Sequence, residues 1–116
     1  MLAESCPFCR IVRGEAKAAI VHRDEKVVAF RDIHPVAPTH ILIIPTKHVA
    51  SLQDLQVNDL EFMGRMMAVA REIVGGEGEP ADGYRLVINT GADAGQSVLH
   101  LHMHLLAGRR MQWPPG

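Results

Sequence analysis

The stretch Gln96-Ser97-Val98-Leu99-His100-Leu101-His102-Met103-His104-Leu105-Leu106 carries three histidines at alternate positions. Successive side chains of a β-strand point to opposite faces, so this alternation predicts a strand with its histidines on one face and its apolar residues on the other. The apolar face would anchor the strand in a core. The imidazole face would line a pocket or bind a metal, because each ring can act as nucleophile, acid, base or hydrogen-bond donor near neutral pH.

Length and composition predict one globular domain over residues 1–116. The sequence is 47% hydrophobic and 22% charged with a formal net charge of −1, so no overall attraction to nucleic acid or to an anionic membrane is expected. The N-terminus lacks the basic start and apolar run of a signal peptide, and the longest apolar run, Ile41–Ile44, is too short to span a bilayer. We therefore expect a cytoplasmic protein without a membrane or nucleic-acid partner.

Four further segments have the composition of strands. They are Ile20–His22, Lys26–Arg31, Thr39–Ile44 and Tyr84–Asn89, the last of which follows a polar loop over Glu77–Gly83. Thr39–Ile44 is apolar on both faces, so it should be central in the sheet. With no regular alternation of strands and helices, five strands predict an α+β fold with a mostly antiparallel sheet.

One long helix and a short helical turn complete the predicted elements. Asn58 and Glu61 resemble a capping box, and the helix that they start should run to about Val74. Its apolar residues form two adjacent stripes, which is wider than one sheet face requires. Part of this surface should therefore pack against a partner subunit, and a thick core is the alternative interpretation. The short turn begins at Cys6 and ends at Gly14.

Two smaller features allow two interpretations each. Cys6 and Cys9 form a Cys-x-x-Cys pair, which without secretion signals favours a metal-binding or structural role over a disulfide framework. His40 lies in the central strand, either as a core residue whose hydrogen bonds are satisfied or in support of the histidine pocket.

Trp113 precedes paired prolines in the tail over residues 109–116 and should dock on another part of the protein.

The run from His100 to Leu106 matches the His-φ-His-φ-His-φ-φ signature, in which φ is an apolar residue, of the histidine-triad (HIT) superfamily. Nearly the whole chain resembles the HINT branch of nucleotide-binding proteins in that superfamily. The matching segments are Ala29–Ile33, Ala37–His40, Ile44–His48, Gly83–Asn89, Gly95–Val98 and Trp113–Gly116. This resemblance implies a homodimer in which two five-stranded sheets join into one ten-stranded sheet. It also implies hydrolysis of purine nucleoside 5′-phosphoramidates of the AMP-amine type.

The resemblance also implies roles for the histidines. His102, central in the triad, would attack the α-phosphorus and form a covalent nucleotidyl-histidine. His104 would contact the phosphate and assist proton transfer. Ser97, His100 and His40 would complete the catalytic group. No cofactor would be required for this chemistry.

The nucleotide pocket implied by the resemblance has three parts. Its phosphate side would be formed by Asn89, Gln96, Ser97 and the backbone N–H of Val98. Asp32 would hold the ribose hydroxyls, although it could also cap a turn, and Ser97 could bond to its own backbone. Phe30 and Ile33 would flank the base, and Trp113 would reach toward the neighbouring subunit's site.

The cysteine pair resembles one that joins two histidines in a structural zinc site in some bacterial members of the branch. The matching histidines are His48 and His100, and two cysteines with two histidines form a sound tetrahedral zinc set. Other members of the branch lack these cysteines, so two free thiols are the alternative to a zinc site at Cys6 and Cys9.

Three alternatives to the phosphoramidase hypothesis remain at this point. The first is a zinc hydrolase in which His100, His102 and His104 bind the metal directly, which would need an open coordination position. The second is a dinucleoside polyphosphate hydrolase of the same superfamily. The third is a dimeric adaptor that senses purine nucleotides without catalysis.

Overall fold

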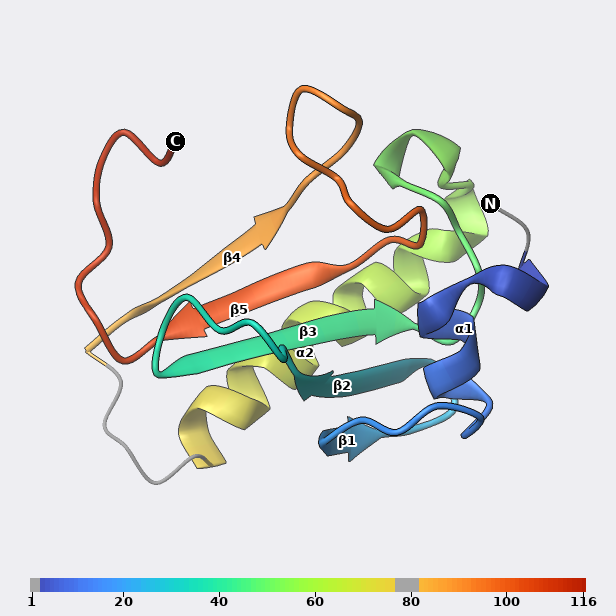
Figure 1. The fold of residues 1–116 in the computed structure, drawn as a ribbon, viewed down its shortest axis with the longest axis horizontal. Helices are drawn as coiled ribbons and strands as arrows, with labels where there is room; N and C mark the ends of the chain where they lie inside the picture. The colour runs from blue at the N-terminus through green and yellow to red at the C-terminus, as the bar shows by residue number, and fades with distance from the viewer. Residues whose placement is uncertain (1–2, 77–81) are drawn as a thin grey trace.

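The computed structural model describes residues 3–76 and 82–116, so most of the predicted loop over Glu77–Gly83 lies outside the described residues. A five-stranded sheet forms its centre, in the order β1-β2-β3-β5-β4, and every neighbouring pair is antiparallel (Figure 1). The strands are β1 (Ile20–Arg23), β2 (Val27–Arg31), β3 (Thr39–Pro45), β4 (Tyr84–Ile88) and β5 (Met103–Ala107). The predicted α+β fold and antiparallel sheet are confirmed.

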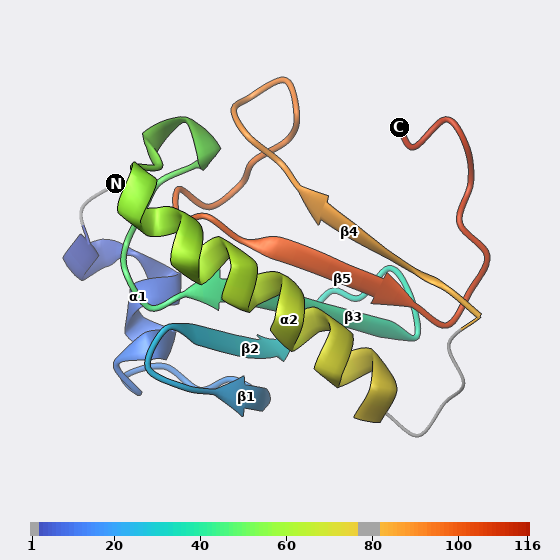
Figure 2. The same cartoon turned by 180° about the vertical axis from the view of Figure 1, so that it is seen from behind.

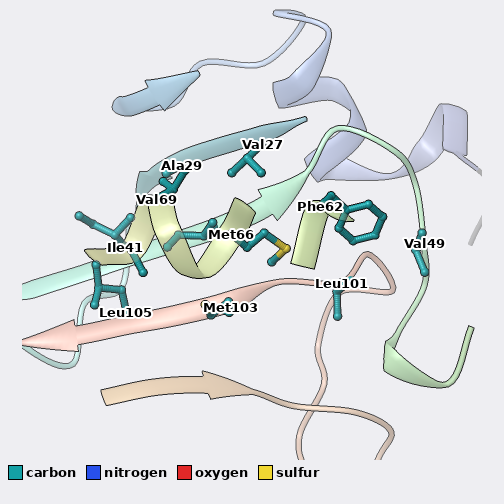
Figure 3. Close-up of a cluster of buried hydrophobic side chains, with 12 residues drawn as sticks. Val27, Ala29, Ile41, Val49, Phe62, Met66, Val69, Leu101, Met103 and Leu105 are labelled. Atoms are coloured by element: carbon teal, nitrogen blue, oxygen red, sulfur yellow. The ribbon is translucent and has the colours of Figure 1, made fainter. Parts of the chain in front are cut away.

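The long helix α2 (Leu60–Gly76) covers one face of the sheet, as Figures 1 and 2 show from opposite sides. Its buried side chains pack against the residues of β2, β3 and β5 that face it (Figure 3). This core includes Val27, Ala29, Ile41, Ile43, Phe62, Met66, Val69, Leu101, Met103 and Leu105. Among the described residues, no helix is both long enough and apolar enough to cross a membrane.

The short helix α1 (Pro7–Val12) lies on the opposite face of the sheet (Figure 1). It ends where Gly14 adopts a φ of +74°, a conformation that favours glycine, and the Gly14 N–H donates to the Ile11 carbonyl at 3.0 Å. Three short 3-10 turns, Ala3–Ser5, Leu52–Asp54 and Val57–Asp59, complete the elements. A second core joins this helix to the sheet, with Phe8 and Ile11 packing against Val28, Phe30, Leu42 and Ile44.

The histidine-rich segment keeps its predicted alternation but becomes a strand only in its second half. The ladders from β3 and β4 both begin at Met103, so the prediction of a strand from His100 onward was wrong at its start. Before that point the Leu101 N–H donates to the Val49 carbonyl at 2.7 Å instead of to a neighbouring strand. Leu101, Met103 and Leu105 nevertheless all face the α2 core. The three histidines therefore lie on the other side of the segment.

The capping box lies before α2, at the 3-10 turn Val57–Asp59 that runs directly into the helix. The Asp59 carboxylate accepts the Gln56 N–H at 2.9 Å, so the prediction of a box at Asn58 and Glu61 placed it two residues too late. The cap forms at Asp59 because Lys47 also pairs with the Asp59 carboxylate at 2.7 Å, which holds this side chain just before the helix.

The two flanks of α2 differ in polarity. One flank is tied to the turn between β1 and β2, because Arg65 contacts Asp24 at 3.0 Å and Glu61 contacts Lys26 at 2.8 Å. The helical period places Leu60 and Met67 on the opposite flank, toward β5 and β4. These two side chains are 60% and 53% exposed. The chain thus leaves an apolar strip of the helix uncovered.

Two hydrogen bonds attach the C-terminal tail, one through its backbone and one through the side chain of Arg109. Arg85 donates to the Gln112 carbonyl at 3.1 Å, and Arg109 donates to the Val36 carbonyl at 2.9 Å. Trp113 is 81% exposed. The prediction that this side chain docks is therefore not met within one chain.

Candidate active site and metal cluster

His102 holds one ring nitrogen as a donor and leaves the other unprotonated. Its Nδ1 lies 2.8 Å from the carbonyl oxygen of His100. A carbonyl oxygen can only accept, so Nδ1 carries the proton and Nε2 of the neutral ring carries a lone pair. The His102 side chain is buried, and the ring of His104 lies beside it with 5.2 Å between centroids. This tautomer suits nucleophilic attack through Nε2.

His104 has the opposite tautomer, set by a relay of hydrogen bonds that starts in the loop before β3. The Val36 N–H donates to Nδ1 of His40 at 3.1 Å, so the proton of the neutral His40 ring is on Nε2. That Nε2–H donates to Nδ1 of His104 at 2.9 Å. Nε2 of His104 therefore carries a proton. Two adjacent rings thus offer a lone pair and an N–H donor.

The relay is uncharged at neutral pH. Burial, with smaller contributions from the neighbouring His102 and His40 rings, lowers the pKa of His104 to about 4. Burial also lowers the pKa of His40, partly offset by the carboxylate of Asp32, which lies 3.3 Å from Nε2 of His40. The other oxygen of Asp32 accepts the His34 N–H at 2.8 Å. The hydrogen bonds therefore fix which nitrogen of each neutral ring is protonated.

Four metal-binding side chains converge between α1, the loop after β3 and the segment before β5. Cys6, Cys9, His48 and His100 each offer one ligand atom, and these atoms lie within 4.8 Å of one another. The Nδ1 atoms of the two histidines are 3.2 Å apart. Sulfur-to-Nδ1 distances are 3.4 Å from Cys6 to His100, 3.2 Å from Cys9 to His48 and 3.5 Å from Cys9 to His100.

The Cys/His cluster, meaning Cys6, Cys9, His48 and His100, fits a tetrahedral zinc ion. Zinc–ligand bonds of about 2.0–2.3 Å place tetrahedral ligands at roughly the spacing seen here. Nε2–H of His100 donates to the Pro45 carbonyl at 2.9 Å, which leaves the lone pair on Nδ1 toward the cluster. Such a hydrogen bond from the remote nitrogen is typical of zinc-binding histidines.

Asp32, His40 and His104 also offer three ligand atoms within 4.8 Å of one another, but they do not fit a metal. Nε2 of His40 is the atom that faces the other two, and the Val36 N–H at Nδ1 forces the ring proton onto Nε2. Among the described residues, His102 belongs to neither group. The three triad histidines therefore do not converge on one point, whereas the zinc-hydrolase alternative requires His100, His102 and His104 to bind the same metal ion.

The loop between β4 and β5 contains the predicted phosphate-side residues. The Gln96 amide uses both N–H donors, on the Ala50 carbonyl at 2.7 Å and the Val98 carbonyl at 3.0 Å, and its oxygen accepts the Gly91 N–H at 3.0 Å. Gln96 therefore braces the loop rather than offering side-chain donors to a ligand. Ser97 is exposed next to it.

A cavity of about 550 Å³ lies at the β4 edge of the same face. It is lined by Val87, Asn89 and Leu106 together with residues of the tail. Val87 pairs directly with His104 in the sheet, and side chains paired in this way share a face. Asn89 directly follows β4, and the cavity that it lines lies next to the face that carries His104 and opens toward the tail.

Phe8 is a site residue that the sequence reasoning missed. Its ring meets His102 edge-on, with centroids 5.2 Å apart and an interplanar angle of 86°, and it contacts Phe30 at 5.5 Å. Phe30 is buried, whereas Ile33 is 85% exposed, so the two predicted base-flanking residues sit in unlike environments. The position of Phe8 between Cys6 and Cys9 was the available signal, because these two cysteines lie beside His100 and so bring Phe8 to the triad.

Protonation of His104 gives a testable pH dependence of stability. Its pKa is about 4 when folded and about 6.5 when unfolded. As the pH falls from about 6.5 to about 4, the unfolded chain binds a proton that the folded chain does not, so the stability falls. Urea unfolding should therefore show a smaller difference between pH 7 and pH 5 for His104→Gln than for the wild type. Equal differences would contradict this pKa.

Comparison with known proteins identifies the family. The model of the HIT domain family matches residues 13–111. The chain is 48% identical over 108 residues to a purine nucleoside phosphoramidase of Escherichia coli, covering 93% of this chain and 91% of that protein. It is also 48% identical over 111 residues to a 14 kDa zinc-binding protein of Zea mays, covering 94% of this chain and 86% of that protein.

A solved structure resembles this fold over its full length. The crystal structure of a HIT family hydrolase from Legionella pneumophila superimposes with a TM-score of 0.93 at 47% identity, covering 97% of this chain and 100% of that one. The family match, the identities and the shared fold agree with the histidine arrangement described above. The chain belongs to the HIT domain family of hydrolases.

Proposed function

We propose that this protein hydrolyses the P–N bond of purine nucleoside 5′-phosphoramidates through a covalent nucleotidyl-histidine. The opposite tautomers of His102 and His104 carry this proposal. A phosphoramidate needs a nucleophile at phosphorus and a proton for the departing nitrogen, and two adjacent rings supply these separate needs. The similarity to a purine nucleoside phosphoramidase over nine-tenths of the chain supports the choice of substrate class.

In the first half-reaction, the Nε2 lone pair of His102 forms a bond to the α-phosphorus as the P–N bond to the amine breaks. The electron pair of that bond stays with the departing nitrogen, which takes a proton from His104. His104 is neutral in the free protein, and the anionic phosphate favours its protonated form, so the ring gains a proton at Nδ1 as the substrate binds. The Nε2–H of His40 then loses its acceptor on His104 and donates to the Asp32 carboxylate, which lies 3.3 Å away. The carboxylate of Asp32, close to His40, favours the same charge.

In the second half-reaction, water attacks the phosphorus of the nucleotidyl-histidine. The water gives a proton to His104, the P–N bond to His102 breaks, and its electron pair returns to Nε2. The products are the nucleoside monophosphate and a protein in which His102 is free and His104 is protonated. As the anionic product leaves, His104 releases to solvent the proton that it gained on substrate binding, and both rings return to their neutral forms. His104 thus acts first as an acid and then as a base.

The remaining site residues bind the substrate in this proposal. Backbone N–H groups of the loop that Gln96 braces, with the Val98 N–H and the hydroxyl of Ser97, contact the phosphoryl oxygens. Asp32 keeps lone pairs for the ribose hydroxyls, and Ile33 covers the base against Phe30. The cavity at Asn89 receives the amine.

We propose that the Cys/His cluster binds a structural zinc ion. The ligand spacing and the Pro45 hydrogen bond to His100 support it, as does the similarity to a protein named for zinc binding. Zinc would cross-link α1 to the strand ends that carry His48 and His100. The proposed chemistry at phosphorus uses only the histidines of the site.

We further infer that residues 1–116 form a single domain that dimerises, with the tail over 109–116 reaching the partner's site. The apolar flank of α2 faces the side of the sheet on which β4 is the edge strand, and a second copy could cover the flank and pair with β4 to extend the sheet to ten strands. The exposed Trp113 would then find its docking surface on the partner.

Replacing Met67 by Glu should convert the dimer to a monomer. Met67 is 53% exposed on the uncovered flank of α2, and a buried carboxylate without a partner would strongly disfavour the interface. Analytical ultracentrifugation measures the mass of the particle. Ile20→Glu is the matched control, because Ile20 is an exposed apolar residue at the opposite edge of the sheet. A monomeric wild type would refute the interface.

Turnover of two substrates tests the proposed function. The wild type should hydrolyse an AMP-amine phosphoramidate with a kcat/KM at least about 100-fold above that for a diadenosine polyphosphate. The reverse preference would favour the dinucleoside polyphosphate hydrolase. Tight binding of AMP without turnover of either substrate would favour the nucleotide-sensing adaptor.

A further inference from the structure

We propose that the Cys/His cluster positions the nucleophile, so that His102 keeps its orientation and its Nδ1–H tautomer only while the cluster is intact. This inference rests on the proposed catalytic role of His102 and on the proposed zinc. It assigns the cluster a role in the reaction beyond holding the fold together. His100 and Phe8 become positioning residues, which act on substrate only through His102.

The first link runs through His100, whose ring and backbone have different tasks. The ring is fully buried and held at both nitrogens, by the cluster at Nδ1 and by the Pro45 carbonyl at Nε2. The backbone carbonyl of the same residue accepts the Nδ1–H of His102 at 2.8 Å. A ring that cannot turn limits the rotation of its own peptide, so the cluster fixes the acceptor that selects the His102 tautomer.

The second link joins the two histidine ligands through the backbone. The Leu101 N–H, next to His100, donates to the carbonyl of Val49 at 2.7 Å, and Val49 follows His48. The peptide after His100 is thus bonded to the peptide after Val49, one residue beyond His48. Because no ladder pairs residues 100–102 with a neighbouring strand, this bond and the cluster together hold the segment that precedes β5.

The third link is the ring of Phe8. Phe8 lies between Cys6 and Cys9 at the start of α1, where the Cys6 sulfur accepts the Cys9 N–H at 3.4 Å. Its ring meets His102 at 5.2 Å and His100 at 6.0 Å, both edge-on. His102 is therefore held between the His100 carbonyl and the Phe8 ring, and the cluster determines where both of them lie.

Nitrogen-15 NMR of the imidazole rings, without substrate, tests this inference directly. The protein as purified should contain one zinc ion per chain and show a single Nδ1–H tautomer at His102. After zinc is removed with a chelator, the folded protein should show both tautomers, and added zinc should restore the first. A zinc-free purified protein, or an unchanged tautomer after removal, would overturn the inference.

Steady-state kinetics with an AMP-amine phosphoramidate give the second measurement. Cys9→Ser should lower kcat by about tenfold to a hundredfold, as is typical when the support of a catalytic group is lost, while KM changes by less than about twofold. Phe8→Leu, which keeps all four ligands, should retain zinc but show mixed His102 tautomers and a lower kcat. It keeps the inference testable if Cys9→Ser fails to fold.

Met66→Ala is the matched control. Met66 is fully buried in the core on the α2 side of the sheet, so this variant also loses stability but keeps the cluster. Its His102 tautomer and kcat should match the wild type. Mixed tautomers in Met66→Ala would show that a general loss of stability, without loss of the cluster, is enough to release His102, and would contradict the inference. A wild type without phosphoramidase activity would refute the proposed function, yet the NMR result would still decide whether the cluster orients His102.

Discussion

Replacing His102 by Ala should lower kcat for an AMP-amine phosphoramidate by at least about 10⁴-fold. The ring is the only protein group in the proposed reaction that bonds to phosphorus, and loss of a covalent nucleophile typically costs about 10⁴ or more in rate. Binding of AMP should change by less than about tenfold, because the phosphate loop and Asp32 remain. Steady-state turnover and isothermal titration calorimetry measure the two effects.

His22→Ala is a suitable control for this variant. His22 lies in β1 and contacts Asp24 at 2.6 Å, at the far edge of the sheet. Its removal should leave kcat within about twofold of the wild type. Turnover retained by His102→Ala at more than a tenth of the wild-type rate would remove His102 from the reaction, and equal losses of turnover and AMP affinity would indicate a binding role instead.

Removing zinc should lower the melting temperature by at least about 10 °C. The cluster joins α1 to the ends of β3 and β5, and Cys6 and His100 are fully buried. A metal that binds the folded chain adds its binding free energy to stability, and a loss of about 3 kcal/mol corresponds to roughly 10 °C in a chain of this length. Differential scanning calorimetry before and after treatment with a chelator measures the shift.

Cys9→Ser separates this effect from other actions of the chelator. The variant should melt at about the temperature of the zinc-free wild type, and the chelator should lower it no further. A chelator effect of equal size on wild type and variant would place the responsible metal elsewhere. An unchanged melting temperature in the wild type would show that the cysteines are free thiols.

The features of the fold that the sequence predicted correctly depend on short-range pattern. The alternation around Met103 predicted the two faces of that segment, because the period of the side chains follows from backbone geometry. The apolar run at Thr39–Ile44, which covers both faces, predicted a central strand. The start of the histidine strand was predicted three residues too early. That boundary depends on where neighbouring strands stop pairing, which lies far away in the sequence.

The start of α2 was missed for a similar reason. Asn58 with Glu61 and Gln56 with Asp59 both have the spacing of a cap. Lys47, from the loop after β3, pairs with Asp59 and decides between them. Local sequence contains both alternatives, and only the tertiary contact selects one.

The residue types in the sequence predicted which side chains form the candidate site, but not which ring nitrogens carry the protons. The resemblance to the HIT superfamily named the histidines that the structure brings together, and it named the four members of the Cys/His cluster. The tautomers could not be predicted, because they depend on the Val36 N–H and the His100 carbonyl. Every residue type has these backbone groups, so their positions cannot be predicted from the pattern of side chains.

Mass spectrometry of the protein quenched during turnover tests the central claim most directly. The reaction is run with an AMP-amine phosphoramidate in excess and is quenched with alkali. Acid is avoided in the quench and in the digestion, because phosphorus–imidazole bonds are labile in acid. The account predicts a peptide that carries one AMP on His102, absent from His102→Ala. An adduct on another residue, or active turnover in which no adduct forms under any quench time, would contradict it.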